Sequence, residues 1–222
     1  MASKIAMTAI HTHHIKQMSD MTWESNKVEY AKKWGYDTYV RTESTMEWHP
    51  SYEKIFFQLQ LMEEHPEHEW FYWSGADSII TNFNIPLETF IDEDYHIVMA
   101  TDRLNINADS YVIRNSPEAR AYWKHICDLA PKYNDHPSGT WEQQALIDTI
   151  AEYRHLWKFV PQRHMNSYLY REVYPQHYIT STNDYLGNDG QWQPGDFLLH
   201  WPGTPMQLRL AMIPQFLQMV IK

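Results

Sequence analysis

The chain has 222 residues, of which 43% are hydrophobic, and its formal net charge is -10. This length suits one large domain with a substantial core. The negative charge argues against a protein that binds nucleic acid or anionic membranes through its overall charge.

Two further features bear on where the protein acts. The single cysteine, Cys127, cannot form a disulfide within the chain, and we expect it to be a small buried residue of a helix in a reducing compartment. No run of 18 apolar residues occurs, and the first residues lead directly into an apolar strand, so we expect no signal peptide and no membrane segment. The sequence therefore predicts a cytoplasmic protein, unless the chain is one domain of a longer multidomain protein.

The first third of the chain alternates strand and helix. Residues 5–10 are apolar and predict a strand, whereas the polar residues 11–22 predict a loop above the sheet. Residues 25–34 predict a helix with Ser25 as its N-cap and Gly35 just past its end. A second strand at residues 36–40 completes a right-handed parallel unit.

The same alternation continues towards the C-terminus. The predicted helices begin near Pro50, Ser116 and Glu142, and the last one, at residues 207–220, is kinked or broken by Pro214. The remaining predicted strands cover residues 69–82, 96–100, 111–113, 159–160 and 197–200, and the polar residues 101–110 read as a loop. We predict one α/β domain over residues 1–222, with a central, mostly parallel sheet flanked by helices and some antiparallel return near the C-terminus.

Residues 69–82 (EWFYWSGADSIITN) are the most informative stretch. A run of aromatic residues predicts a strand buried on both faces, and it ends in small residues that include Asp77. An acidic side chain at the carboxyl end of such a strand is typical of binding sites in open α/β sheets. Because the protein is acidic, a diphosphate bound here would need a cation, so we expect Asp77 to hold one. A turn or helix-cap role for Asp77 is the alternative.

Four stretches of sequence together resemble glycosyltransferase family 34. They are WSGADSIITN from Trp73, NINADSYVIRNS from Asn105, WEQQAL from Trp141 with VPQRHMNSY from Val160, and GDFLLHWPG from Gly195. The Asn26-Lys27 pair ahead of Gly35-Tyr36 also looks like the N-terminal region of that family. Within the family, the Ala-Asp-Ser triplet looks like the glycosyltransferase domains of large algal viruses. This resemblance implies a GT-A fold, a retaining sugar transfer, and a cation-assisted UDP-sugar donor.

The resemblance places Asp77 and His200 on a Mn²⁺ or Mg²⁺ ion. It also shows a departure, because Gly75 stands where the family has its first acid, and one protein ligand is lost. The sequence therefore predicts a weak cation site that the phosphates of the nucleotide complete. A histidine buried in the core is the alternative role for His200.

The resemblance also assigns the remaining site residues. Glu142 and Gln143 are expected to act on the reacting sugar, with Asp109 as an extra carboxylate; a helix N-terminal role for Glu142 and a solvated loop for Asp109 stay open. The donor-binding residues that the resemblance and the fold imply are Thr8, Ala9, Lys54, Ala76, Asp77, Ser78, Asn107, Trp201 and Gly203. Of these, Thr8 and Ala9 would contact the base through their backbone, and Lys54 (or Arg209) would replace a lysine that the family has after Gly203.

The predicted function is therefore a retaining, Mn²⁺-dependent transfer of glucose, galactose, xylose or rhamnose from a UDP-sugar to a glycan or glycoprotein acceptor, such as a viral capsid or cell-surface glycan. If the source is a virus, the reaction takes place in the host cytoplasm. Two alternatives remain. One is a weak or inactive module that binds nucleotide-sugars or glycans, and the other is a metal-buffering protein rich in histidine, with 13 histidines in the chain.

Overall fold

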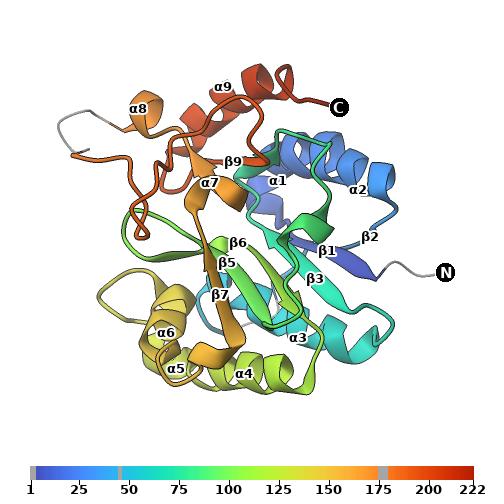
Figure 1. Cartoon of the computed structure of the whole chain (residues 1–222), viewed down its shortest axis with the longest axis vertical. Helices are drawn as coiled ribbons and strands as arrows, with labels where there is room; N and C mark the ends of the chain where they lie inside the picture. Colours follow the sequence, from blue (N-terminus) through green and yellow to red (C-terminus); the bar gives the residue numbers. More distant parts are fainter. Residues whose placement is uncertain (1–3, 45–46, 175–179) are drawn as a thin grey trace.

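A computed structural model describes residues 4–44, 47–174 and 180–222. The described residues are built around a six-stranded sheet with the strand order β2-β1-β3-β6-β5-β7, and helices lie on both sides of it (Figure 1). Its strands are β1 (Ile5–Ile10), β2 (Asp37–Arg41), β3 (Trp70–Ser74), β5 (Ile97–Thr101), β6 (Ile106–Arg114) and β7 (Trp157–Val160).

Most neighbouring strands of this sheet are parallel. Strand β1 pairs in parallel with β2 and β3, and β5 pairs in parallel with β7. Strand β6 runs against both of its neighbours, β3 and β5. The predicted α/β class with a mixed, mostly parallel sheet is confirmed, but in this sheet the antiparallel strand lies in the middle.

The central antiparallel strand arises from a tight turn after β5. The carboxylate of Asp102 accepts hydrogen bonds from the backbone N–H groups of Leu104 and Asn105, at 2.8 and 3.1 Å. Such a turn reverses the chain within a few residues, which only antiparallel neighbours allow. The loop predicted at residues 101–110 is shorter than expected, because only residues 102–105 separate the two strands and both Asn107 and Asp109 belong to β6.

One face of the sheet is covered by four helices, which gather below the sheet in Figure 1. They are α3 (Glu53–Glu64), α4 (Pro117–Asp128), α5 (Ala130–Tyr133) and α6 (Trp141–Thr149). Helix α4 begins as predicted, with Ser116 Oγ accepting a hydrogen bond from the N–H of Ala119. Cys127 is buried on α4, also as predicted.

The opposite face is covered by one helical run that starts earlier than predicted. A 3-10 turn (His13–Ile15), α1 (Lys16–Ser19), a π-helical segment (Asp20–Lys27) and α2 (Val28–Trp34) follow one another without a break. Ser25 lies inside this run and donates to the carbonyl of Asp20, so it is not an N-cap. Buried side chains such as Trp23 hold the first half against the sheet, which local polarity does not reveal. Gly35 ends the run at φ 75°, as predicted.

A second, three-stranded sheet joins distant parts of the chain. Its order is β4-β9-β8, formed by β4 (Ser78–Ile80), β9 (Leu198–His200) and β8 (Ser167–Tyr168). The predicted strand at residues 69–82 is thus two strands, β3 and β4, which belong to different sheets. This second sheet pairs Ser78 with His200. It thereby brings His200, from the last quarter of the chain, beside the loop that joins β3 to β4.

The remaining elements are α7 (Gln162–Met165), α8 (Tyr170–Val173), α9 (Met206–Leu217) and the 3-10 turns Pro50–Tyr52, Leu87–Phe90 and Arg154–Leu156. Of these, α8 and α9 lie at the top of the molecule in Figure 1. Helix α9 is continuous with Pro214 inside it, so the predicted break does not occur.

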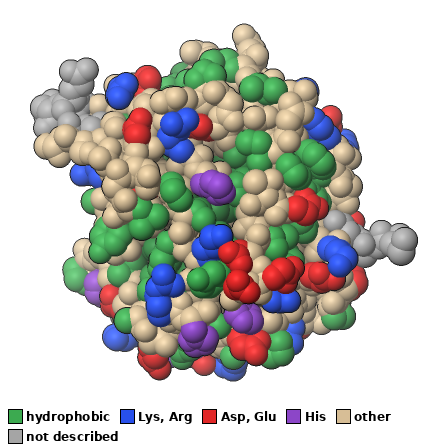
Figure 2. Space-filling view, in the orientation of Figure 1, with side chains coloured by type: hydrophobic (Ala, Val, Ile, Leu, Met, Phe, Trp, Pro, Cys, Tyr) green, Lys and Arg blue, Asp and Glu red, His purple; other side chains and the backbone are tan. Residues whose placement is uncertain are grey.

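None of the helices in the described ranges combines the length and the hydrophobicity needed to span a bilayer. On the face that Figure 2 shows, apart from the grey atoms, basic and acidic side chains are intermixed.

Candidate active site

The loop that carries Asp77 joins β3 to β4, and side chains hold it in place through hydrogen bonds to its backbone carbonyls. The carbonyl of Gly75 accepts hydrogen bonds from Lys27 Nζ at 2.6 Å and from Ser78 Oγ at 2.7 Å. The carbonyl of Ala76 accepts one from Thr22 Oγ1 at 2.7 Å. Burial lowers the pKa of Lys27 to about 7, although nearby carboxylates oppose this. The loop is therefore a rigid support that fixes the position of the Asp77 carboxylate.

The side chain of His200 is fully buried, and its ring orientation follows from a chain of amides. Asn107 Oδ1 accepts a hydrogen bond from the backbone N–H of Asp109 at 3.0 Å, and Asn166 Nδ2 donates to the same oxygen at 2.9 Å. Asn166 Oδ1 is thereby left to accept from His200 Nδ1, at 2.9 Å. In the neutral ring, the lone pair of Nε2 then points away from Asn166, towards two carboxylates.

Asp77, Asp109 and His200 form a compact group whose ligand atoms lie within 4.8 Å of one another. His200 Nε2 is 3.2 Å from Asp77 Oδ1 and 4.0 Å from Asp109 Oδ2. This Nε2 is buried and has no hydrogen-bond partner among the described residues. An unpartnered imidazole lone pair facing two carboxylate oxygens is the donor set of a divalent cation site. The predicted pair Asp77 and His200 is brought together, with Asp109 beside it.

Asp77 is also paired with a cation of the protein. Arg209 Nη2, from α9, lies 2.7 Å from Asp77 Oδ2. Burial opposes ionisation of Asp77, but the interactions with the adjacent His200 ring and with the charge of Arg209 outweigh it and hold the pKa of this carboxyl well below its usual range. The Asp77 carboxylate is therefore ionised over the whole physiological range of pH.

Lys54 links two of the predicted catalytic carboxylates. Its Nζ lies 2.7 Å from Glu142 Oε1 and 3.0 Å from Asp109 Oδ1, and it donates to the carbonyl of Ala108 at 2.9 Å. Burial disfavours the charge of Lys54, but Asp109 and Glu142 outweigh it and raise the pKa of Lys54 above its usual value. With three acceptors around it, Lys54 orients the two carboxylates. Because Lys54 is engaged in this way, Arg209 is the better placed of the two residues predicted to contact the phosphates.

The carboxylates of Asp77, Asp109 and Glu142 line a cavity of about 860 Å³ together with Lys54 and Arg209. A cavity of this volume can hold a ligand of the size of a disaccharide. The predicted residues on its wall are Lys54, Asp77, Asn107, Asp109, Glu142, Gln143, Gly203 and Arg209. Glu142 Oε2 is buried there and has no hydrogen-bond partner in the described part of the chain, whereas Gln143 Oε1 accepts a hydrogen bond from the N–H of Ala108 at 3.0 Å.

Several predicted donor-binding side chains lie outside this wall. Thr8 is buried in the sheet, where its hydroxyl donates to the carbonyl of Tyr72. Ala9 and Trp201 are buried in core clusters, and Ala76 and Ser78 serve the loop around Asp77. The side chain of Trp201 does not reach the cavity wall, because it is buried and its ring packs against Phe216 in the core. The predicted backbone contacts of Thr8 and Ala9 stay a prediction.

The cavity also contains residues that the sequence reasoning missed. Asp102 follows β5 directly, as Asp77 follows β3, so the same argument would have found it. Trp141 lies on the wall at φ 37°, an unusual conformation for a bulky residue, and its ring stacks on His49 with centroids 3.4 Å apart. Further aromatic residues on the wall are Trp73, Tyr168, Tyr170 and Tyr174.

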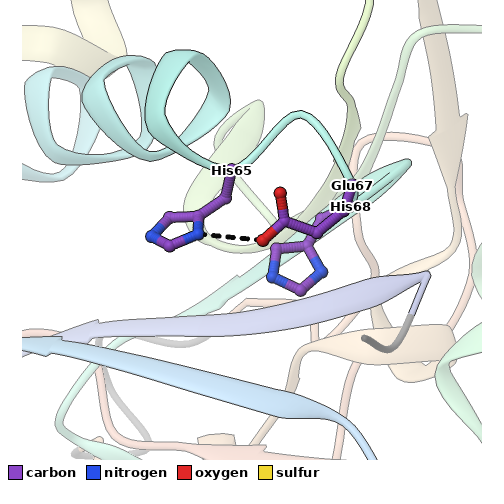
Figure 3. A group of neighbouring side chains, drawn as sticks. All are labelled: His65, Glu67 and His68. Atoms are coloured by element: carbon purple, nitrogen blue, oxygen red, sulfur yellow. Dashed lines mark hydrogen bonds and ion pairs between the residues drawn. The ribbon is translucent and has the colours of Figure 1, made fainter. Parts of the chain in front are cut away.

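A second cluster of possible metal ligands lies at the turn between α3 and β3 (Figure 3). It consists of His65, Glu67 and His68, and His65 Nδ1 lies 3.0 Å from Glu67 Oε1. The hydroxyl of Tyr39 contacts both rings, at 3.3 Å from His65 Nδ1 and 2.8 Å from His68 Nε2. Hydrogen bonds within the cluster account for these atoms, in contrast to Nε2 of His200.

Comparisons with known proteins agree with the family resemblance. Residues 4–93 match the galactosyl transferase GMA12/MNN10 family. The probable alpha-1,2-galactosyltransferase gmh1 of Schizosaccharomyces pombe is 22% identical over 84% of this chain and 63% of its own length. An uncharacterized alpha-1,2-galactosyltransferase of the same yeast, C637.06, is 23% identical over 64% of this chain and 53% of its own length. The chain thus spans less than two thirds of these relatives.

Solved structures show the same fold. A glycosyltransferase involved in glycosylation of the major capsid of PBCV-1 superposes with a TM-score of 0.69 at 19% identity, over 95% of this chain and 98% of that one. The galactosyltransferase LgtC, solved with donor and acceptor sugar analogues, gives 0.64 at 10% identity, over 98% and 96%. Residues 4–93 thus resemble the galactosyl transferase GMA12/MNN10 family, and the chain has the fold of the GT-A glycosyltransferases.

Proposed function

We propose that the protein is a retaining, Mn²⁺-dependent glycosyltransferase that moves a sugar from a UDP-sugar to a glycan acceptor. The observation that carries this proposal is the unpartnered Nε2 of His200, which faces the carboxylates of Asp77 and Asp109 beside the cavity. A cation held there would stabilise the negative charge that develops on the departing diphosphate.

The donor diphosphate is proposed to bind next to Arg209. The guanidinium lies 2.7 Å from Asp77, so phosphate oxygens that approach the cation would also come within reach of Arg209. An arginine in this place supplies the charge that the sequence lacks after Gly203.

The sugar is proposed to lie over Glu142. The Oε2 atom of Glu142 is a buried acceptor to which none of the described residues donates, and a hydroxyl group of the donor sugar would satisfy it. Its Oε1 atom and the Asp109 carboxylate are both held by Lys54. Because a carboxylate paired with an ammonium group is a weaker nucleophile, these pairs favour a front-face transfer over a covalent intermediate. The departing phosphate would then take the proton of the acceptor hydroxyl.

The donor sugar is proposed to be galactose in the first instance, because both yeast relatives are named alpha-1,2-galactosyltransferases. The acceptor is proposed to be a glycan or glycoprotein, in line with the capsid glycosylation ascribed to the PBCV-1 protein. The aromatic side chains of Trp141, Tyr170 and Tyr174 on the cavity wall offer flat apolar surfaces for the acceptor sugar.

A second candidate function is a nucleotide-sugar-binding module without turnover. The observation in its favour is the ion pair between Arg209 and Asp77, because a protein cation already neutralises the acid that would hold the metal. This candidate predicts donor binding that is independent of Mn²⁺ and no release of UDP.

The test combines binding with turnover. A thermal-shift panel of UDP-galactose, UDP-glucose, UDP-xylose and GDP-mannose, each with and without Mn²⁺, should show one donor that raises the melting temperature only when Mn²⁺ is present. Slow release of UDP from that donor should depend on Mn²⁺ and should be lost in Asp77→Ala. The control Asp94→Ala, which removes an exposed acid, should behave as the wild type. Donor binding without any UDP release, with or without an acceptor, would support the second candidate instead.

A further inference from the structure

Gly75 stands where the family has its first acid, and the space beside it is filled. A Cβ atom added at Gly75 would lie 2.9 Å from Asp77 Oδ1 and 3.4 Å from both Cβ and Cγ of Asp109. The first of these distances is shorter than an ordinary contact, so the end of the Asp77 side chain would have to shift. The Asp109 side chain is in van der Waals contact with the position where a side chain at residue 75 would begin.

We propose that Asp109 replaces the acid missing at Gly75, so that a carboxylate moved to the neighbouring strand completes the cation site with Asp77 and His200. The inference rests on the cation of the proposed function and adds its third protein ligand.

The pairing of β3 with β6 explains how a carboxylate on β6 can take the place of one at residue 75. Strands β3 and β6 are antiparallel, with Ser74 opposite Ser110, and the N–H of Gly75 donates to the carbonyl of Asp109 at 2.9 Å. Residues opposite each other in an antiparallel pair project to the same side of the sheet. A carboxylate on Asp109 therefore reaches nearly the same place as one on residue 75 would.

The two oxygens of Asp109 have different surroundings. Oδ1 is held by Lys54 at 3.0 Å, while Oδ2 faces His200 Nε2 at 4.0 Å. Adjacent ligands of an octahedral cation with bonds near 2.1 Å lie roughly 3 Å apart. The 3.2 Å from His200 Nε2 to Asp77 Oδ1 is close to this spacing, and the 4.0 Å to Asp109 Oδ2 would shorten by about 1 Å on binding a shared cation. The Asp109 side chain is 39% exposed, which leaves it open to the cavity.

Binding of Mn²⁺ measured in the presence of UDP, by electron paramagnetic resonance of free Mn²⁺, tests the proposal without relying on turnover. Asp109→Asn should weaken Mn²⁺ binding by about tenfold or more. The matched control is Glu142→Gln, which removes the same charge from the same Lys54 but does not face His200; it should change the affinity by less than about threefold. Both variants should keep the wild-type circular dichroism spectrum.

A relocation experiment gives the second readout. Gly75→Asp alone should weaken Mn²⁺ binding, because the added side chain meets Asp77 and Asp109. Gly75→Asp combined with Asp109→Gly should return the affinity to within about threefold of the wild type. Recovery of binding in this double variant supports the relocation.

The failures are distinguishable. If the wild type binds Mn²⁺ with UDP and Asp109→Asn binds it equally well, the inference is overturned while the proposed function stands. If the wild type binds no Mn²⁺ with UDP, the cation of the proposed function fails and the inference fails with it. A folded double variant that does not recover binding would also overturn the relocation.

Discussion

His200 Nδ1 donates a hydrogen bond to Asn166 Oδ1 at 2.9 Å, deep inside the protein. Asn166 in turn donates to Asn107, so its amide has only one orientation that satisfies both neighbours. This hydrogen bond decides which nitrogen of His200 faces the carboxylates. Asn166 is therefore a positioning residue, because it orients the ring that would bind the cation.

Asn166→Ala should therefore weaken Mn²⁺ binding in the presence of UDP by about 10- to 100-fold, the usual effect of losing a group that orients a ligand histidine. Titration with Mn²⁺ checks this directly. The control Asn188→Ala, at an exposed site, should leave the affinity unchanged. Wild-type affinity in a folded Asn166→Ala variant would show that the ring keeps its orientation without Asn166.

Lys54→Met should destabilise the fold by about 3–5 kcal/mol, because it leaves the buried carboxylate of Glu142 without its cation. The control Lys158→Met breaks the ion pair between Lys158 and Asp92, in which the lysine side chain is 41% exposed. This control should cost less than about 1 kcal/mol. Urea unfolding of the two variants measures both values. Equal losses would mean that the Lys54 pair contributes no more than an ordinary surface pair.

Arg209→Met should separate nucleotide binding from metal binding. Loss of charge-assisted hydrogen bonds to the diphosphate should weaken UDP affinity by about 10- to 100-fold. Because Arg209 competes for Asp77, the affinity for Mn²⁺ without UDP should stay the same or rise. Calorimetric titrations with each ligand distinguish the two effects, with Lys124→Met on the exposed face of α4 as the control. A parallel loss of both affinities would mean that Arg209 supports the site as a whole.

Stability should fall on the acid side because of His11. Its ring lies edge-on to Trp23, with centroids 5.3 Å apart, and burial lowers the pKa of His11 to about 3, with the charge of Lys27 acting in the same direction. Since the unfolded chain takes up this proton near pH 6.5 and the folded chain does not, the free energy of unfolding should fall as the pH drops from 6.5 towards 3.

His11→Phe should make the unfolding free energy less dependent on pH between 7 and 5, as urea unfolding at several pH values would show. The control His13→Phe changes an exposed histidine and should keep the wild-type dependence. Identical pH profiles for the wild type and His11→Phe would mean that His11 takes up its proton in the folded state as readily as in the unfolded one.

Some of the site followed from the sequence alone. Asp77 follows a buried strand, where the aromatic run predicts it. Ser116 caps the start of its helix and Gly35 ends its helix, as their types predict. These features depend on neighbours within a few residues along the chain. The helical run before Ser25 was missed, because its polar surface hides the buried side chains that hold it to the sheet.

What the sequence by itself determined is the resemblance to glycosyltransferases, the α/β class and the two residues, Asp77 and His200, that face each other beside the cavity. Only the tertiary structure decided which other groups join them. The register of β3 against β6 sets Asp109 opposite Gly75, and the fold brings Lys54 between Asp109 and Glu142. These partners are separated by tens of residues, and a shift of one residue in register would turn Asp109 to the other side of the sheet, so local sequence patterns carry no record of them.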